Sequence, residues 1–573
     1  MDQERTNEIP LLPTDESSKT LKLEQSENPN NATFPDSKLN PEQETPLVED
    51  ETEDQTNRPK NHVQDQSIKL APTQLALVFG GLCLTTLLGS MDMTIVATAL
   101  PVIASDLQDV SLLPWVATAY MITTTGFQPL YGRCSDIFGR RSMIAFAIVV
   151  FLLSTVWCAL APNMIQLIVA RGFQGIGGAG LLGMSQVVLV DILPLRERGK
   201  YQGILGSVWA VSSIVGPLLG GVPIGALAFF MVVSFLNLPR VKGDMMQKFR
   251  RVDFIGSFFL LSFCLLLQLG LNFGGSRYPW SSYQVLVPLL LAVVVVVPVF
   301  LYIETLVAMP ILPPDFWKNR NVIGVLGAAF GQGIALYGTI YYCPIFFEVV
   351  QGSTATSSGL KLIPLMLPVS IVQTLVGFYI SSTGIYVPII RIGTALSCIA
   401  VGLIALFDLN TSSGEQIGIL LFNGVSLGLV INTVMLCGQA NVPYSHLGAV
   451  TSCFQFFRSI GGSVGIAIMG AILNNKLRSN IIASGLPESV VQTAQNSIGA
   501  IKNLPAGDQG LVIAAYSDAL RLVWIIACAF AGISFIFSLI LYHVPLKTTM
   551  GKKSDKELTD AVEERKKAQQ NSA

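Results

Sequence analysis

Two opposite charges stand inside apolar stretches of this sequence, where a charged side chain is energetically costly. Asp92 lies in an apolar run that ends at Leu100, and Thr94 follows it closely. Arg171 lies in a second run, together with Gln174. Such a charge needs a counter-ion, a polar cavity or, for the carboxylate, a proton. The chemistry that these residues could perform is therefore ion pairing combined with reversible proton binding.

No set of residues in the sequence indicates an enzyme, a metal site or a cofactor. The three histidines stand in separate segments, and the nine cysteines are scattered without paired spacing. No nucleophile and base are paired in a recognisable motif, and no basic face for nucleic acid is present. We therefore expect no enzymatic activity, no cofactor, no metal and no nucleic-acid partner. Carboxylates would have to carry any proton coupling.

The composition indicates which elements position these charges. Only 13% of the 573 residues are charged, against roughly 25% in a typical soluble domain. Residues 71–546 contain only 38 of the 73 charged residues. This arithmetic excludes a soluble enzyme and predicts an all-α polytopic membrane protein in a lipid bilayer. Fourteen stretches are long enough to cross about 30 Å of hydrocarbon: 73–100, 111–131, 142–161, 165–190, 201–220, 223–239, 254–274, 284–304, 321–347, 357–380, 386–407, 416–437, 449–472 and 520–543.

The charged residues outside these spans set the orientation. Residues 1–70 hold 16 acidic and 7 basic residues, which predicts a disordered acidic tail, and residues 547–573 form a second charged tail. An even number of spans places both tails on one side. In the first half, alternate loops hold 13 Lys and Arg residues, and the loops between them hold only Arg277. By the positive-inside rule, both tails are cytoplasmic. The long loop 473–519 would be external, with short surface helices at 490–501 and 510–516.

A charged turn follows the second span and contains Gly132, Asp136, Gly139, Arg140 and Arg141. Its glycines permit a tight turn, and its aspartate can accept hydrogen bonds from a facing helix N-terminus. The arginines can pair with carboxylates or lipid phosphates. An alternative is a plain turn that only marks the cytoplasmic face.

Two further glycine patterns accompany this turn. Gly377, Ser381 and Gly384 repeat its spacing after the tenth span with the charges lost, which indicates duplicated halves with a site between them. At the end of the fifth span, a proline and glycines would bend the helix and allow close packing. The alternative there is a kinked packing helix without a direct role. This second pattern consists of Gly216, Pro217, Gly220 and Gly221.

Asp92 and Arg171 are predicted to lie at similar depth in the membrane. Asp92 is eight residues from the outer end of its span and Arg171 is six residues from the same surface, or about 12 Å and 9 Å at 1.5 Å per residue. We therefore expect the two to face one cavity, directly or through a few residues. There, the protonation of Asp92 would be sensitive to the occupant. The alternative is a purely structural ion pair.

Further charged residues lie in or near spans, among them two glutamates and an arginine. Glu304 and Glu348 stand at span ends and are expected at the membrane interface. Arg458 is a second cation within a span, and the sequence indicates no partner for it.

Together, the four motifs that contain Asp92, Gly132, Arg171 and Gly216 resemble those of the major facilitator superfamily, in particular its fourteen-span drug:proton antiporter branch. The resemblance covers about residues 72–545. It implies alternating access, in which the motif around Asp136 latches the cytoplasmic side and Asp92 and Arg171 couple proton occupancy to the motion. It also implies two six-helix bundles, residues 71–240 and 309–546, with two additional helices in 241–308.

The chain departs from this branch after Gly221. Relatives usually have a longer connection there, whereas Val222 to Gly225 follow at once in this sequence. Only 15 residues, 224–238, remain for the sixth span. At 1.5 Å per residue they reach about 22 Å, which is short for a bilayer.

The resemblance implies a monomeric, proton-coupled antiporter that moves small organic compounds, drugs or toxicants out of the cytosol across the plasma membrane. The alternative is a vacuolar antiporter of basic amino acids, which would need both charges in its cavity. A third possibility is a membrane sensor that transports nothing. Drug efflux calls for an aromatic cavity, and the candidate aromatic residues are Trp115, Tyr120, Trp209, Phe330, Tyr337 and Tyr341.

Overall fold

The computed structural model describes residues 71–107, 113–215, 245–274, 278–496, 501 and 504–546. Helices account for nearly all of these residues, and the described part contains no β-strand. Both predicted tails, the predicted sixth span and the motif at Gly216, Pro217, Gly220 and Gly221 lie outside the described residues.

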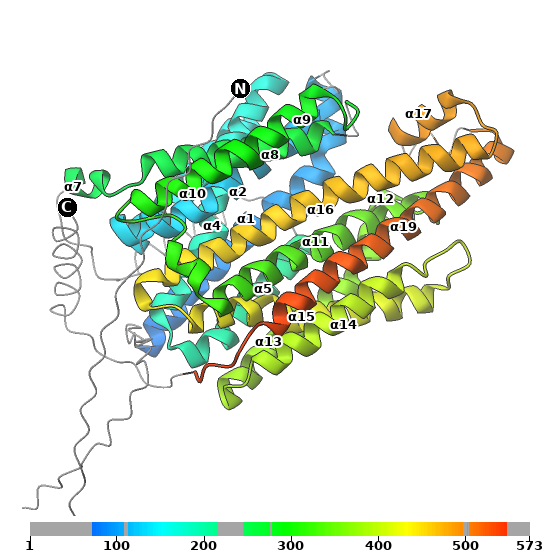
Figure 1. Ribbon diagram of the computed structural model, residues 1–573. Coiled ribbons are helices and arrows are strands. Elements are labelled where there is room, and N and C mark those ends of the chain that lie inside the picture. The colour runs from blue at the N-terminus through cyan, green and yellow to red at the C-terminus, as the bar shows by residue number, and fades with distance from the viewer. Residues whose placement is uncertain are drawn as a thin grey trace, which may run out of the picture. The chain divides into compact units, whose positions relative to one another are not determined.

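The helices follow the predicted spans closely (Figure 1). The first part of the chain forms α1 (Pro72–Leu107), α2 (Leu113–Phe138), α3 (Arg140–Ala159), α4 (Met164–Ile192) and α5 (Leu195–Val215). The middle forms α7 (Met245–Arg250), α8 (Phe254–Phe273), α9 (Tyr283–Leu290) and α10 (Val297–Leu306), with the π-helical segment Leu291–Val296 joining the last two. The last part forms α11 (Arg320–Val349), α12 (Ala355–Leu360), α13 (Ile363–Thr383), α14 (Val387–Ile404), α15 (Ser413–Ala440), α16 (Leu447–Ala483), α17 (Glu488–Asn496) and α19 (Ala506–Leu539).

Eleven helical segments within the described residues are long and apolar enough to cross a membrane. Helices α2 and α5 occupy the predicted second and fifth spans but carry several polar and charged residues, and they are not among the eleven. The chain is thus an integral multi-pass membrane protein. Its total of fourteen spans stays a prediction.

The loop predicted at 473–519 is largely helical, and part of the prediction was wrong. Helix α16 continues to Ala483, and α17 forms the first of the two expected short helices. The second expected helix, 510–516, is instead the start of α19. Leu477 and Ile481 on α16 and Tyr516 on α19 are all buried in one apolar cluster. Packing between the two helices therefore extends them beyond the ends of their apolar spans.

The helices pack in two groups. In the first, α4 lies against α2, α3 and α1, around a core that includes Leu82, Ile148 and Leu181. In the second, α11 lies along α16 and α19, and α15 lies against α13 and α14. Figure 1 shows α16, α11, α19 and α14 running side by side. The two groups meet where α2 contacts α16 and where α5 contacts α13. Helix α8 packs on α2.

Candidate functional site

Asp92 and Arg171 form an ion pair between α1 and α4. Arg171 Nη1 lies 2.8 Å from Asp92 Oδ2 and donates a second hydrogen bond to Gln174 Oε1 at 2.7 Å. Gln174 Nε2 donates to Asp92 Oδ1 at 2.9 Å and lies 2.9 Å from Thr155 Oγ1. Asp92 and Arg171, which residue counting places at similar depth, therefore contact each other directly. Thr94 lies on α1 two residues after Asp92, and its side chain lies outside the described part.

Two further groups contact the guanidinium of Arg171, in addition to Asp92 and Gln174. The ring of Tyr120 lies 4.3 Å from Arg171, and Arg171 Nε donates to the carbonyl of Val116 at 3.4 Å. The Arg171 side chain is 4% exposed and that of Asp92 12%. A buried ion pair tolerates this desolvation only when further hydrogen bonds complete it, and this network supplies them.

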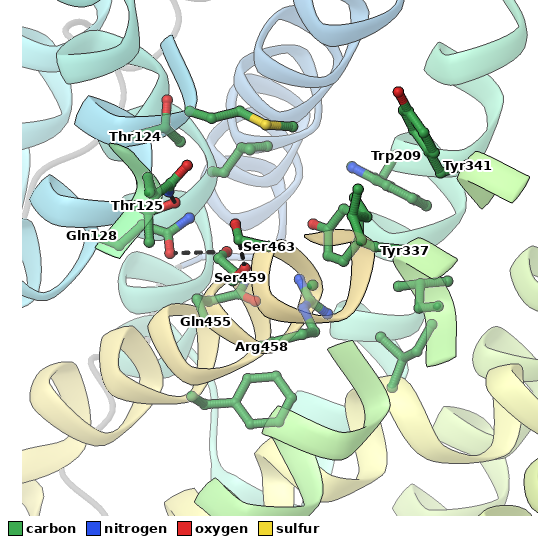
Figure 2. Close-up of a pocket in the computed structure, with 18 of the residues that line it drawn as sticks. Thr124, Thr125, Gln128, Trp209, Tyr337, Tyr341, Gln455, Arg458, Ser459 and Ser463 are labelled. Carbon is green, nitrogen blue, oxygen red and sulfur yellow. Dashed lines mark hydrogen bonds between the residues drawn. The ribbon is translucent and has the colours of Figure 1, made fainter. Parts of the chain in front are cut away.

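A cavity of about 330 Å³ lies between the two helix groups (Figure 2). Hydroxyl and amide groups from α2 form one wall, and aromatic rings from α5 and α11 form another. This volume falls in the range of small-molecule sites. The labelled lining residues in Figure 2 are Thr124, Thr125, Gln128, Trp209, Tyr337, Tyr341, Gln455, Arg458, Ser459 and Ser463.

Asp92 and Arg171 do not line this cavity directly. Neither residue is among its described lining residues, and Gln174 is also absent from them. Tyr120, which covers Arg171, lies one turn before Thr124 on α2, and Thr124 lines the cavity while donating to the carbonyl of Gly175 at 3.1 Å. The ion pair therefore lies behind the wall that α2 and α4 form, within one helical turn of the cavity.

The sequence left open which aromatic residues line the cavity. Trp209, Tyr337 and Tyr341 do, whereas Trp115, Tyr120 and Phe330 are not among the described lining residues. Arg458 is the only charged residue among them. The sequence identifies Arg458 as an intramembrane cation but does not indicate which site it faces, because helix rotation cannot be inferred from depth alone.

The predicted charged turn forms an ion-pair network. The turn lies at the end of the helix bundle where Gly139 stands, and we call this end of the bundle the motif end. Asp136 lies 2.6 Å from Arg140 Nη1 and 3.3 Å from Arg133 Nη1. Arg140 Nε donates to Asp191 at 2.6 Å. Because Asp191 stands at the end of α4, Arg140 fastens α2, α3 and α4 together. Arg141 follows on α3 and is half-buried.

This network lies against the N-terminus of α16. A Cβ placed on Gly448, the second residue of α16, would lie 3.2 Å from both Asp136 Oδ1 and Arg140 Nη1. A Cβ on Gly132 would lie 2.3 Å from Ser452 Oγ and 2.9 Å from the Gly448 carbonyl. Only glycine therefore lets α2 approach α16 here. Gly139 has φ = 93°, a conformation that a side chain would strain.

The repeated glycine pattern makes the corresponding contact between α13 and α5. A Cβ on Gly377 would lie 2.2 Å from the carbonyl oxygen of Gly199. Arg196 Nε on α5 donates to the carbonyl of Ser381 at 2.7 Å. Gly384 ends α13 with φ = 76°. Two equivalent glycine contacts thus join the helix groups at the motif end, one with an ion-pair network and one without.

Glu304 stands near the end of α10, and its side chain is buried within the protein. It is 2% exposed, and its Oε2 accepts a hydrogen bond from the Leu312 amide at 2.8 Å. Asp253 lies nearby and caps α8 by accepting from the Gly256 amide at 2.7 Å. Burial of this carboxyl follows from the turn after α10, which folds back over it. Glu348 is half-buried and accepts from Ser358 at 2.8 Å.

The fold and the cavity define a multi-pass α-helical membrane protein with a ligand-sized site between two helix groups. A family model described as the Major Facilitator Superfamily matches residues 82–466. The chain belongs to this superfamily, and it is a transporter of small molecules rather than an enzyme.

Individual relatives agree with this assignment. The "MFS-type efflux pump LUC4" of a Fusarium species is 30% identical over 523 residues, which cover 87% of this chain and 93% of the relative. "Efflux pump FUS6" of Gibberella fujikuroi is 32% identical over 511 residues, covering 84% and 92%. Among solved structures, that of the human organic anion transporter MFSD10 (TETRAN) covers 81% of this chain and 100% of its own, at 14% identity and a TM-score of 0.51. That likeness concerns the fold alone.

Proposed function

We propose that the protein is a proton-coupled antiporter that exports small organic compounds from the cytosol. The observation that carries this proposal is the cavity of about 330 Å³ between two helix groups that touch at the motif end. Alternating access requires a central site and a contact that can open and close on one side. Relatives across most of the chain are named efflux pumps, which favours export.

Proton coupling rests on the network around Asp92. Its carboxylate receives hydrogen bonds from Arg171 and Gln174, and the ionised form accepts such bonds more strongly than the protonated form. Protonation of Asp92 would remove the negative charge opposite Arg171 and so change what holds α1 against α4. Because Thr124 joins this region to the cavity wall, occupancy and protonation could influence each other over one turn of α2.

The cavity disfavours the alternative of basic amino acid transport. That cargo has two positive groups and one negative group, and it would need a carboxylate in the site. No Asp or Glu is among the described lining residues, whereas Arg458 is. We propose that the protein acts in the plasma membrane, with both tails cytoplasmic and the motif end on the same side. We also propose that it works as a monomer.

The test is transport in reconstituted vesicles with an acidic interior. We expect fluorescein or a similar fluorescent organic compound to accumulate inside, and a protonophore to abolish the accumulation. Vesicles without protein are the control. Accumulation that persists after the pH gradient is collapsed would contradict proton coupling, and no accumulation of any compound in a chemically broad panel would contradict export.

Asp136→Ala should slow conformational cycling without removing cargo binding. The substitution deletes the ion pairs to Arg140 and Arg133 and the carboxylate beside Gly448. We expect the exchange rate to fall roughly tenfold, which corresponds to about 1.4 kcal/mol, while the affinity for cargo stays within about twofold. Exchange and equilibrium binding, measured on the same vesicles, check this. Loss of binding with normal exchange would show that Asp136 serves the site instead.

A further inference from the structure

Arg458 on α16 is a cation that faces the central cavity. It makes no hydrogen bond or ion pair with any residue that the structure describes, and its Nε atom is fully buried. Its guanidinium carbon lies 5.6 Å from the centre of the Phe454 ring. Arg171 and Arg140, by contrast, are each matched by carboxylates. A guanidinium cannot lose its proton, so Arg458 brings a permanent positive charge to the site.

The crossing of α11 and α16 fixes the position of this charge. A Cβ on Gly333 of α11 would lie 2.0 Å from the carbonyl oxygen of Arg458, so the two backbones touch there. One turn further along α16, a Cβ on Gly462 would lie 2.3 Å from the ring of Tyr337. Arg458 and Tyr337 are therefore held next to each other by glycine contacts. Figure 2 shows both side chains at the same wall of the cavity.

The other residues that line the cavity would suit a bound molecule that has an apolar body and a polar edge. Trp209 and Tyr341 supply aromatic surface, and Gln128 and Ser459 form a hydrogen bond of 3.3 Å across the other side. Gln455, one turn before Ser459 on α16, has an Oε1 atom without a hydrogen-bond partner among the described residues. None of the described lining residues is acidic, so none of them can neutralise the charge of Arg458.

We propose that the cargo is an organic anion, with a carboxylate or an equally acidic oxygen on an aromatic or apolar body, and that Arg458 binds the anionic group. The planar guanidinium can donate two parallel hydrogen bonds to a carboxylate. The aromatic wall takes the apolar body, and the cavity of about 330 Å³ accommodates a molecule of two or three rings. This inference rests on the proposed export function and assigns its substrate class.

The experiment measures equilibrium binding to the full-length protein in lipid nanodiscs, without a pH gradient. The probes are benzoate, 2-naphthoate and 9-anthroate, each compared with its neutral amide and with the corresponding arylmethylammonium ion. We expect at least one acid to bind about tenfold or more tightly than its amide and its ammonium analogue. Arg458→Gln should reduce the affinity for the acid to that for the amide, and amide binding should stay within about twofold, which also shows that the site remains folded.

Two further variants separate charge from geometry. Arg458→Lys keeps the charge but not the planar fork, and it should retain part of the preference for the acid. Arg478→Gln is the matched control, because Arg478 stands on the same helix, is 58% exposed and pairs with Glu488 outside the cavity. It should leave every affinity unchanged.

The proposal is overturned if the ammonium ions bind as tightly as the acids, if none of the acids binds, or if Arg458→Gln keeps the full preference. Because the measurement needs no gradient, its outcome is separate from that of the transport test. Binding of acids without transport would overturn only the export function, and transport of cations without binding of acids would overturn only the substrate class.

Discussion

Asp92→Asn should abolish proton-driven accumulation of cargo in vesicles and leave the protein folded. The substitution preserves the shape of the side chain but removes the group that can gain and lose a proton. We expect accumulation in response to a pH jump to fall at least tenfold, to the level of the protonophore-treated control. Exchange of cargo down its own gradient, without a pH difference, should continue.

Folding should survive because Arg171 keeps its other partners. Removing one member of a buried ion pair commonly costs about 3–5 kcal/mol when the remaining charge has no compensation. Here Gln174 still accepts a hydrogen bond from Arg171 at 2.7 Å, and the ring of Tyr120 still covers it at 4.3 Å. The asparagine oxygen can also replace one carboxylate oxygen. We therefore expect a loss of thermal stability well below that of Asp92→Ala.

Asp315→Asn is the matched control for this prediction. Asp315 pairs with Lys318 at 3.5 Å, and its side chain is 64% exposed, so its charge contributes little. Accumulation by this variant should equal that of the parent. If Asp92→Asn accumulates cargo normally in response to a pH jump, Asp92 has no part in proton coupling and the pair with Arg171 is structural.

The position of Asp92 and Arg171 illustrates what the sequence could predict. Counting residues along two spans gives their depth, because a helix advances 1.5 Å per residue. Similar depth and opposite charge were enough to predict that the two share one environment, with an ion pair as one of the two alternatives. Counting does not give the direction in which a side chain points around the helix. That direction depends on packing against neighbours, so the sequence could not show that Tyr120 separates Arg171 from the cavity.

The direction of the Arg458 side chain could not be predicted from the sequence either. Its place in an apolar span was visible, but the contacts that aim it at the cavity are between backbones at Gly333 and Gly462. Such contacts pair residues more than a hundred positions apart and leave no local pattern. The extension of α16 to Ala483 was missed for a related reason. Apolarity ends where the predicted membrane ends, whereas the helix continues as long as Leu477 and Ile481 remain buried.

Gly377→Ala should impair transport more than any other replacement of a glycine by alanine at the contact between α5 and α13. The new methyl group would lie 2.2 Å from the carbonyl oxygen of Gly199 and 2.9 Å from the Cα of Lys200. Both are backbone atoms, so no side-chain rotation can relieve the clash. The two helices must separate at the motif end, and overpacking of this kind costs about 1–3 kcal/mol.

The energetic cost of the Gly377→Ala substitution affects only one of the two conformations of the transporter. In alternating access, α5 and α13 touch when the motif end is closed and separate when it opens, so the added methyl group destabilises the closed state alone. A difference of 1–3 kcal/mol changes the ratio of the two states by roughly 5- to 150-fold. We expect the transport rate to fall by at least tenfold, because the protein returns too rarely to the closed arrangement.

Gly199→Ala provides a control within the same contact. A Cβ on Gly199 would lie 3.5 Å from Gly377 Cα, which is an ordinary van der Waals distance, so this variant should transport almost normally. Spin labels at Glu197 on α5 and Thr383 on α13, both exposed, report the opening of the motif end directly. Gly377→Ala should shift their distance distribution to longer values, and Gly199→Ala should not. Equal effects of the two variants would mean that the contact acts through general packing, and an unchanged distribution with normal transport in both would remove it from the gate.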